Sequence, residues 1–170
     1  MTQLLPRYGH STLADLLPSL SSHLGLAGAE DVLGLPDAPR YLVVLIDGLG
    51  RGLLDAYAAH APFLAGLGDR TITSGVPSTT ATSITSLGTG LAPGAHGIAG
   101  YSFWYPPARQ VLQTLRWPAG IDGLDVQPQL TCFERLERAG VRTATIAPAH
   151  FSGSGLSVAA LRGPAFLPVT

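Results

Sequence analysis

The sequence contains no lysine, because all ten of its basic residues are arginines. A phosphate-binding loop of the Walker type needs a Gly-Lys-Ser or Gly-Lys-Thr step, so this class of nucleotide-binding protein is excluded. Cysteine is almost as rare. Cys132 stands alone, which excludes an intramolecular disulfide and a zinc site built from paired cysteines. The net charge of -1 gives no electrostatic reason to expect a nucleic-acid-binding or membrane-binding surface.

The sequence also lacks a hydrophobic run long enough to span a membrane. Hydrophobic residues make up 46% of the chain, but they are dispersed. The longest strongly apolar run, "YLVVLI" at 41–46, has the length of a strand, whereas a membrane span needs roughly 18 residues. Residues 1–20 do not combine a basic start with an unbroken apolar block, as a signal peptide would. We therefore expect a cytoplasmic protein without a membrane partner.

The order of the expected elements indicates an α/β domain. Short apolar strands at 41–46, 70–76 and 141–148 alternate with helical patterns, and such alternation is typical of a largely parallel central sheet flanked by helices. The run 41–46 is apolar throughout, as in a strand buried on both faces of a parallel sheet. Residues 1–39 read as a lead-in segment, and "YSFWYPPARQVLQTLRW" at 101–117 predicts a hairpin that projects from the sheet.

Asp47 is the first candidate site residue, because it directly follows the predicted strand 41–46 and precedes glycine. The carboxyl ends of strands are where α/β folds place ligands and metals. An Asp before Gly is equally common as the cap of a turn or helix, so both interpretations stay open. A third is a dinucleotide-binding loop in "DGLGRG", although the spacing of a G-x-G-x-x-G motif is absent.

The stretch "VPSTTATSITSLGTG" at 76–90 is unusually rich in hydroxyl side chains. Its apolar residues recur at three- to four-residue steps, which predicts a helix after Pro77. A hydroxyl at a helix N-terminus lies beside unpaired backbone N–H groups, where a phosphoryl group binds readily. A neutral threonine needs a base or a metal to become a nucleophile. Alternatively, Ser78, Thr79 and Thr80 are only helix caps.

Two stretches together resemble the alkaline phosphatase superfamily. They are "VVLIDGLG" at 43–50 and "VPSTTATSITSLGTGLAPGAHGIAGY" at 76–101. A strand ending in Asp-Gly, a threonine-containing helix ending in Thr-Gly-Leu-x-Pro and a later His-Gly-Ile occur in the family's order. The similarity is closest to the branch of nucleotide pyrophosphatases, phosphodiesterases and related bacterial phosphohydrolases. It extends from about residue 40 to the C-terminus.

The resemblance implies an alkaline-phosphatase-like α/β fold with a phosphoryl-transfer site that holds two zinc ions. Asp47 matches the family's first metal ligand. Thr80 matches the nucleophile, which in such enzymes also ligates one zinc and is transiently phosphorylated. His96 matches a family position that we interpret as a structural hydrogen-bonding residue. Tyr101 stands near the place where many nucleotide-cleaving relatives carry an asparagine that holds a phosphate oxygen, and its hydroxyl is able to donate a similar bond.

The implied function is metal-dependent hydrolysis of phosphoric esters, of the phosphodiester or nucleotide pyrophosphate type, through a phosphorylated Thr80. The substrate would be a small-molecule phosphate ester or a nucleotide. Such sites use two metal ions about 4 Å apart to stabilise the entering and leaving oxygens.

The family completes its metal sites with an Asp followed four positions later by His, an Asp-His pair and a further His. The sequence contains none of these patterns. We therefore expect residues 1–170 to be the N-terminal portion of one truncated alkaline-phosphatase-like domain, with 40–170 carrying the core strands, nucleophile helix and hairpin. The chain alone would be inactive, and the missing C-terminal half or a partner chain would supply the remaining zinc ligands. The alternative is a catalytically inactive α/β module that binds a phosphorylated ligand or a partner protein.

Overall fold

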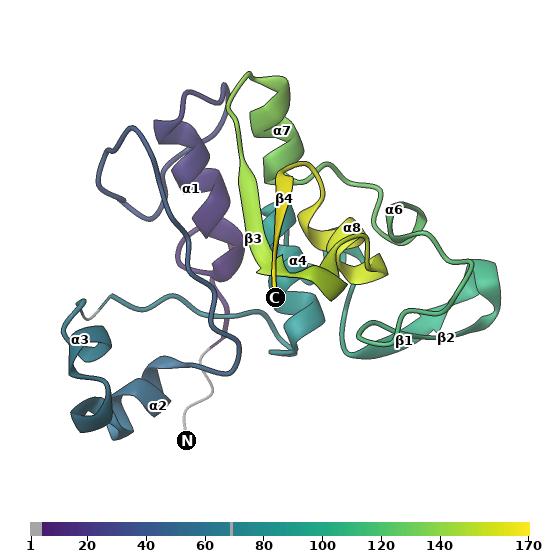
Figure 1. The fold of residues 1–170 in the computed structure, drawn as a ribbon, viewed down its shortest axis with the longest axis horizontal. Coiled ribbons are helices and arrows are strands. Elements are labelled where there is room, and N and C mark those ends of the chain that lie inside the picture. The colour runs from purple at the N-terminus through teal and green to yellow at the C-terminus, as the bar shows by residue number, and fades with distance from the viewer. Residues whose placement is uncertain (1–4, 69) are drawn as a thin grey trace.

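The computed structural model describes residues 5–68 and 70–170 (Figure 1). The α-helices of this part are α1 (Leu16–His23), α2 (Arg51–Ala56), α3 (Pro62–Ala65), α4 (Thr80–Thr89), α5 (Pro93–His96), α6 (Gly123–Val126), α7 (Cys132–Arg138) and α8 (Gly155–Leu161). Short 3-10 helices are η1 (Leu13–Asp15), η2 (Ala58–His60), η3 (Pro106–Ala108) and η4 (Ala149–Phe151). The strands are β1 (Ser102–Tyr105), β2 (Gln110–Gln113), β3 (Ala144–Pro148) and β4 (Ala165–Val169).

Helix α4 lies at the centre of the packed part of the molecule, in contact with α1, α7 and α8. One hydrophobic cluster ties it to α1 and α7 through Leu17, Leu20, Leu87 and Cys132. A second cluster ties it to α8 through Ala81, Ile98 and Ala159. Small side chains let α4 and α8 approach closely, since a Cβ placed on Gly88 would lie 1.7 Å from the carbonyl oxygen of Ala160. The helix that begins at Thr80 is therefore rigidly held along its length.

The expected α/β composition is present, but the largely parallel central sheet is not. The described residues form two small sheets of two strands each. Strands β3 and β4 pair in parallel, with Ile146 opposite Leu167. Strands β1 and β2 form the expected antiparallel hairpin, with Trp104 opposite Val111, and this hairpin projects from the helices in Figure 1.

The prediction of a paired strand at 41–46 is wrong. Its backbone is not part of any ladder in the described chain, and Leu42 and Val44 are 83% and 71% exposed. A strand exists only when a neighbour satisfies its N–H and C=O groups, and no described segment does so here. The predicted strand 70–76 is similarly reduced to one bridge between Thr73 and Thr12.

The segment between Gly48 and Gly68 forms a separate small lobe around α2 and α3 (Figure 1). Residues 53–67 do not form one continuous helix: α2 ends at Ala56, η2 follows, and Pro62 begins α3. Neither α2 nor α3 contains a buried residue, and Phe63 is 77% exposed. In the described part of the chain no helix combines the length and the apolar character needed to cross a membrane.

Candidate functional site

Two hydroxyls of helix α4 bond back to the helix itself. Thr85 and Thr89 are buried and donate back to the carbonyl oxygens of Ala81 and Thr85, at 2.7 and 2.6 Å. The N-cap is Thr79, whose Oγ1 accepts from the backbone N–H of Thr82. Of the three residues that were candidates for caps, Thr79 therefore has this role, and the hydroxyl of Thr80 is left for another partner.

That partner is Asp47. The hydroxyl of Thr80 donates to the Oδ2 atom of Asp47 at 3.0 Å, across 33 residues of sequence. The N-cap of α2 is Gly50, so Asp47 does not cap the following helix. Asp47 and Thr80, the two residues that the sequence resemblance singled out, thus meet at the N-terminus of α4.

The pair offers two oxygen atoms of the kind that bind divalent cations in proteins. A catalytic zinc usually has three protein ligands, and residues 5–68 and 70–170 contain no group of three or more His, Cys, Asp or Glu side chains arranged for a metal ion. The donor chemistry at Asp47 and Thr80 fits part of a metal site. The first backbone N–H groups of α4 add a partial positive charge that favours an anionic phosphoryl group there.

His96 is buried and hydrogen-bonded, as expected of a structural residue. Its Nδ1 accepts from the backbone N–H of Ile98 at 3.2 Å, and its Nε2 lies 2.9 Å from the Ser86 hydroxyl. Since Nδ1 is an acceptor, Nε2 carries the proton and donates to Ser86. The ring therefore joins α4 to the turn after α5, and burial lowers the pKa of His96 to about 4.

Because His96 is buried and its pKa is lowered, we expect the protein to lose stability in mild acid. The pKa of His96 rises to its ordinary value of 6.5 on unfolding, so the unfolded chain binds more protons below that value. Stability is full above pH 6.5 and falls as the pH drops toward 4. We expect this residue alone to remove about 2 kcal/mol of unfolding free energy between about pH 7 and pH 5. Urea denaturation at both pH values measures the loss, and the H96Q variant should show a smaller pH dependence.

Tyr101 is not brought to the Asp47–Thr80 pair by any contact among the described residues. It directly precedes β1 and is 47% exposed. Its carbonyl oxygen accepts from the backbone N–H and the hydroxyl of Thr114, at 3.0 and 2.8 Å. These bonds fix its backbone at the base of the hairpin.

The dinucleotide-binding interpretation of "DGLGRG" gains no support from the structure. That motif requires a strand before the glycines and a helix opened by them. Here residues 41–46 are not a strand, and α2 after Gly50 has only six residues. The resemblance to phosphoester hydrolases rests instead on the two sequence stretches that contain Asp47 and Thr80.

Comparison with known families identifies the chain within that class. The family model of type I phosphodiesterases / nucleotide pyrophosphatases matches residues 41–165, a range that includes Asp47, Thr80 and Tyr101. The protein belongs to this family, consistent with the nucleotide pyrophosphatase branch of the alkaline phosphatase superfamily. Family membership indicates hydrolysis of phosphoric esters. No curated protein and no solved structure gave a significant match.

Proposed function

We propose that this protein takes part in metal-dependent hydrolysis of phosphodiesters or nucleotide pyrophosphates through a phosphorylated Thr80. The observation that carries the proposal is the 3.0 Å hydrogen bond from the Thr80 hydroxyl to Asp47. It joins the two family-matched residues in the described chain although one lies on a loop and the other on α4.

Each residue has a defined task in this reaction. The Thr80 oxygen attacks phosphorus and displaces the ester oxygen of the substrate, and water then cleaves the phosphothreonine. The backbone N–H groups at the start of α4 stabilise the negative charge on the phosphoryl oxygens. Asp47 orients the Thr80 oxygen, and the two residues are the chain's donors to a zinc ion. When bound, zinc supplies Lewis-acid stabilisation of the alkoxide and the phosphate. The Tyr101 phenol donates to a substrate phosphate oxygen.

We further propose that residues outside this chain complete the metal centre, either in the C-terminal half of a longer enzyme or in a partner chain. Two donors are too few for a catalytic zinc site. The extended segment that leads directly into Asp47 is apolar and exposed, with Leu42 at 83%, whereas strands of parallel sheets are normally covered on both faces. Added strands on this segment would bring further ligands next to Asp47.

The test begins with the protein as its native cell makes it. Its intact mass is compared with the 17.6 kDa of this chain, and zinc-dependent hydrolysis of bis(p-nitrophenyl) phosphate is measured on that native form. Turnover that depends on zinc supports the hydrolase. Tight zinc binding and turnover by the 170-residue chain alone would reject the shared site. Binding of phosphate esters without turnover in the native form would favour the inactive binding module.

Asp47→Ala is the matching test of the metal ligand. In the complete enzyme we expect it to weaken zinc affinity by at least about tenfold, because a charged oxygen donor is lost. Competition with a chromogenic chelator measures the affinity. The control is Asp55→Ala, since Asp55 is exposed and pairs with Arg51 on α2. Equal zinc affinity in the Asp47 and Asp55 variants would remove Asp47 from the site.

A further inference from the structure

A histidine at the end of α1 lies between two carboxylates of the loop that leads toward Asp47. The Nε2 atom of His23 is 2.9 Å from Oδ2 of Asp31, and its Nδ1 atom is 3.4 Å from Oδ1 of Asp37. The His23 and Asp31 side chains are only 20% and 16% exposed, whereas Asp37 is 86% exposed. One ring thus contacts both ends of the stretch 31–37.

Asp31 organises the loop from within. Besides His23, its carboxylate accepts from the backbone N–H groups of Leu33 and Leu35, at 3.0 and 2.6 Å. The turn at 31–35 therefore depends on the position of this carboxylate, and His23 connects that carboxylate to α1.

Tyr41 closes the same loop at its far end. Its hydroxyl donates to the carbonyl oxygen of Pro36 at 2.8 Å and accepts from the backbone N–H of Ala38 at 3.0 Å. Its ring lies 6.1 Å from the ring of His23 and packs against the cluster of α1, α4 and α7. Tyr41 directly precedes residues 42–46, which lead into Asp47. The position of loop 31–41 therefore fixes where the segment 42–46 starts.

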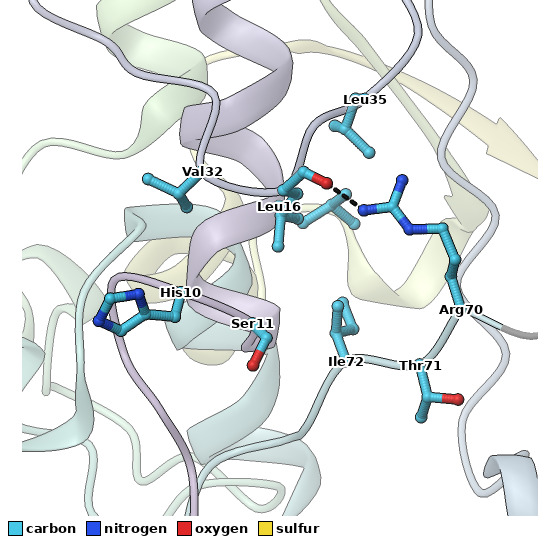
Figure 2. A pocket seen from close by; sticks show the side chains of 9 residues that line it. His10, Ser11, Leu16, Val32, Leu35, Arg70, Thr71 and Ile72 are labelled. Atoms are coloured by element: carbon cyan, nitrogen blue, oxygen red, sulfur yellow. Dashed lines mark hydrogen bonds between the residues drawn. The ribbon is translucent and has the colours of Figure 1, made fainter.

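Arg70 is a second anchor of the loop. Its guanidinium donates to the carbonyl oxygens of Leu33 and Gly34. Figure 2 shows it reaching toward the loop across a pocket of about 330 Å³, near Leu16 and Leu35. The charged groups on and beside the loop are thus Asp31, Asp37 and Arg40 within it, Glu30 directly before it, and His23 and Arg70 from outside it.

The arrangement is not a metal site, because the two carboxylates approach opposite nitrogens of the ring and cannot converge on one ion. It instead requires a particular protonation state. A neutral imidazole donates from only one nitrogen, whereas an imidazolium donates from both. Contact with Asp31 and Asp37 at once is therefore favourable only while His23 is charged.

We propose that His23 is a pH-sensitive latch, whose charged ring holds Asp31 and Asp37 together and fixes loop 31–41 against α1. Loss of one ring proton to solvent breaks one of the two contacts and loosens the loop that leads into Asp47. This latch does not depend on the phosphoester chemistry proposed above.

The direction of the pH dependence follows from the two partners. The hydrogen bond with Asp31 raises the pKa of His23, outweighing the lowering effect of burial. The latch is therefore intact below about pH 6.5 and is lost as the pH rises through the raised value. Burial by itself would raise the pKa of Asp31, but hydrogen bonds from His23 and from the N–H groups of Leu35 and Leu33 lower it. On the acid side the latch accordingly persists until the pH falls through that lowered value.

Hydrogen–deuterium exchange tests the latch on the intact chain. Protection factors, which correct for intrinsic exchange, are compared at about pH 6 and about pH 8.5 for the amide of Ala38, which follows Asp37 and donates to the Tyr41 hydroxyl. We expect protection to fall by about threefold or more at the higher pH. NMR titration of the His23 ring should give a midpoint that coincides with this loss. His60→Gln is the control, because that histidine is exposed and its ring contact is with Tyr57.

Two variants make the result decisive. His23→Gln should abolish the pH dependence of protection in the loop, since glutamine does not titrate. If that variant fails to fold, Asp37→Asn at an exposed position should still lower the titration midpoint of His23 and move the loss of protection to lower pH. Unchanged protection between the two pH values, or unchanged pH dependence in His23→Gln, would overturn the latch. So would an unshifted His23 titration in Asp37→Asn.

Discussion

Thr80→Ala is expected to lower the kcat of the complete, zinc-loaded enzyme by at least about a thousandfold, because it removes the attacking oxygen. The replaced hydroxyl is half-buried and donates only to Asp47 among the described side chains. Helix α4 should stay intact, since its N-cap is Thr79 and alanine is a favourable helix residue. Initial rates on bis(p-nitrophenyl) phosphate give the loss.

The controls separate the nucleophile from its surroundings. Ser78→Ala removes an exposed hydroxyl two positions earlier and should leave kcat within about twofold. Thr80→Ser keeps a hydroxyl and should retain part of the activity. Mass spectrometry of the quenched wild-type enzyme should find a phosphate on the peptide that contains Thr80. Full activity in Thr80→Ala would show that another group attacks phosphorus.

Gly88→Ala carries the largest expected effect on stability. A Cβ at this position would lie 1.7 Å from the carbonyl oxygen of Ala160 and 2.9 Å from its carbonyl carbon. Backbone atoms cannot move aside as a side chain can, so α4 and α8 must separate. We expect a loss of at least about 3 kcal/mol of unfolding free energy.

Urea denaturation compares this variant with Gly52→Ala. Gly52 is in helix α2, is exposed and has no neighbour within 4 Å of an added Cβ. Alanine there should raise stability by about 0.5–1 kcal/mol through helix propensity alone. Opposite signs in the two variants would establish steric contact as the cause. Equal effects would mean that α4 and α8 do not pack as closely as the structure has them.

The structure brings together two residues that the sequence had singled out, but it does not form the expected central sheet. Asp47 and Thr80 were identified from short motifs, and the structure brings their oxygens within hydrogen-bonding distance. Segment 41–46 has every local property of a buried strand, but pairing depends on neighbours that local pattern does not specify.

The cluster around His23 could not be anticipated from sequence. Neither a lone histidine at a helix end nor an aspartate in a Gly- and Pro-rich loop has a distinctive pattern. Their contact arises only from the path of the loop 31–41. The same holds for the choice of Thr79 as cap, which depends on where the first turn of α4 begins.

The run 41–46, which is exposed except at Tyr41, also bears on how the protein behaves in solution. Six uncharged residues of high β-propensity, without proline or glycine, are the kind of segment that self-associates into fibrous assemblies. Arg40 and Asp47 flank the run with opposite charges and act as gatekeepers against that association. Substituting Asp47 thus removes both a charge that opposes aggregation and a proposed metal ligand. Zinc affinities of such variants are meaningful only on samples shown by light scattering to be monodisperse.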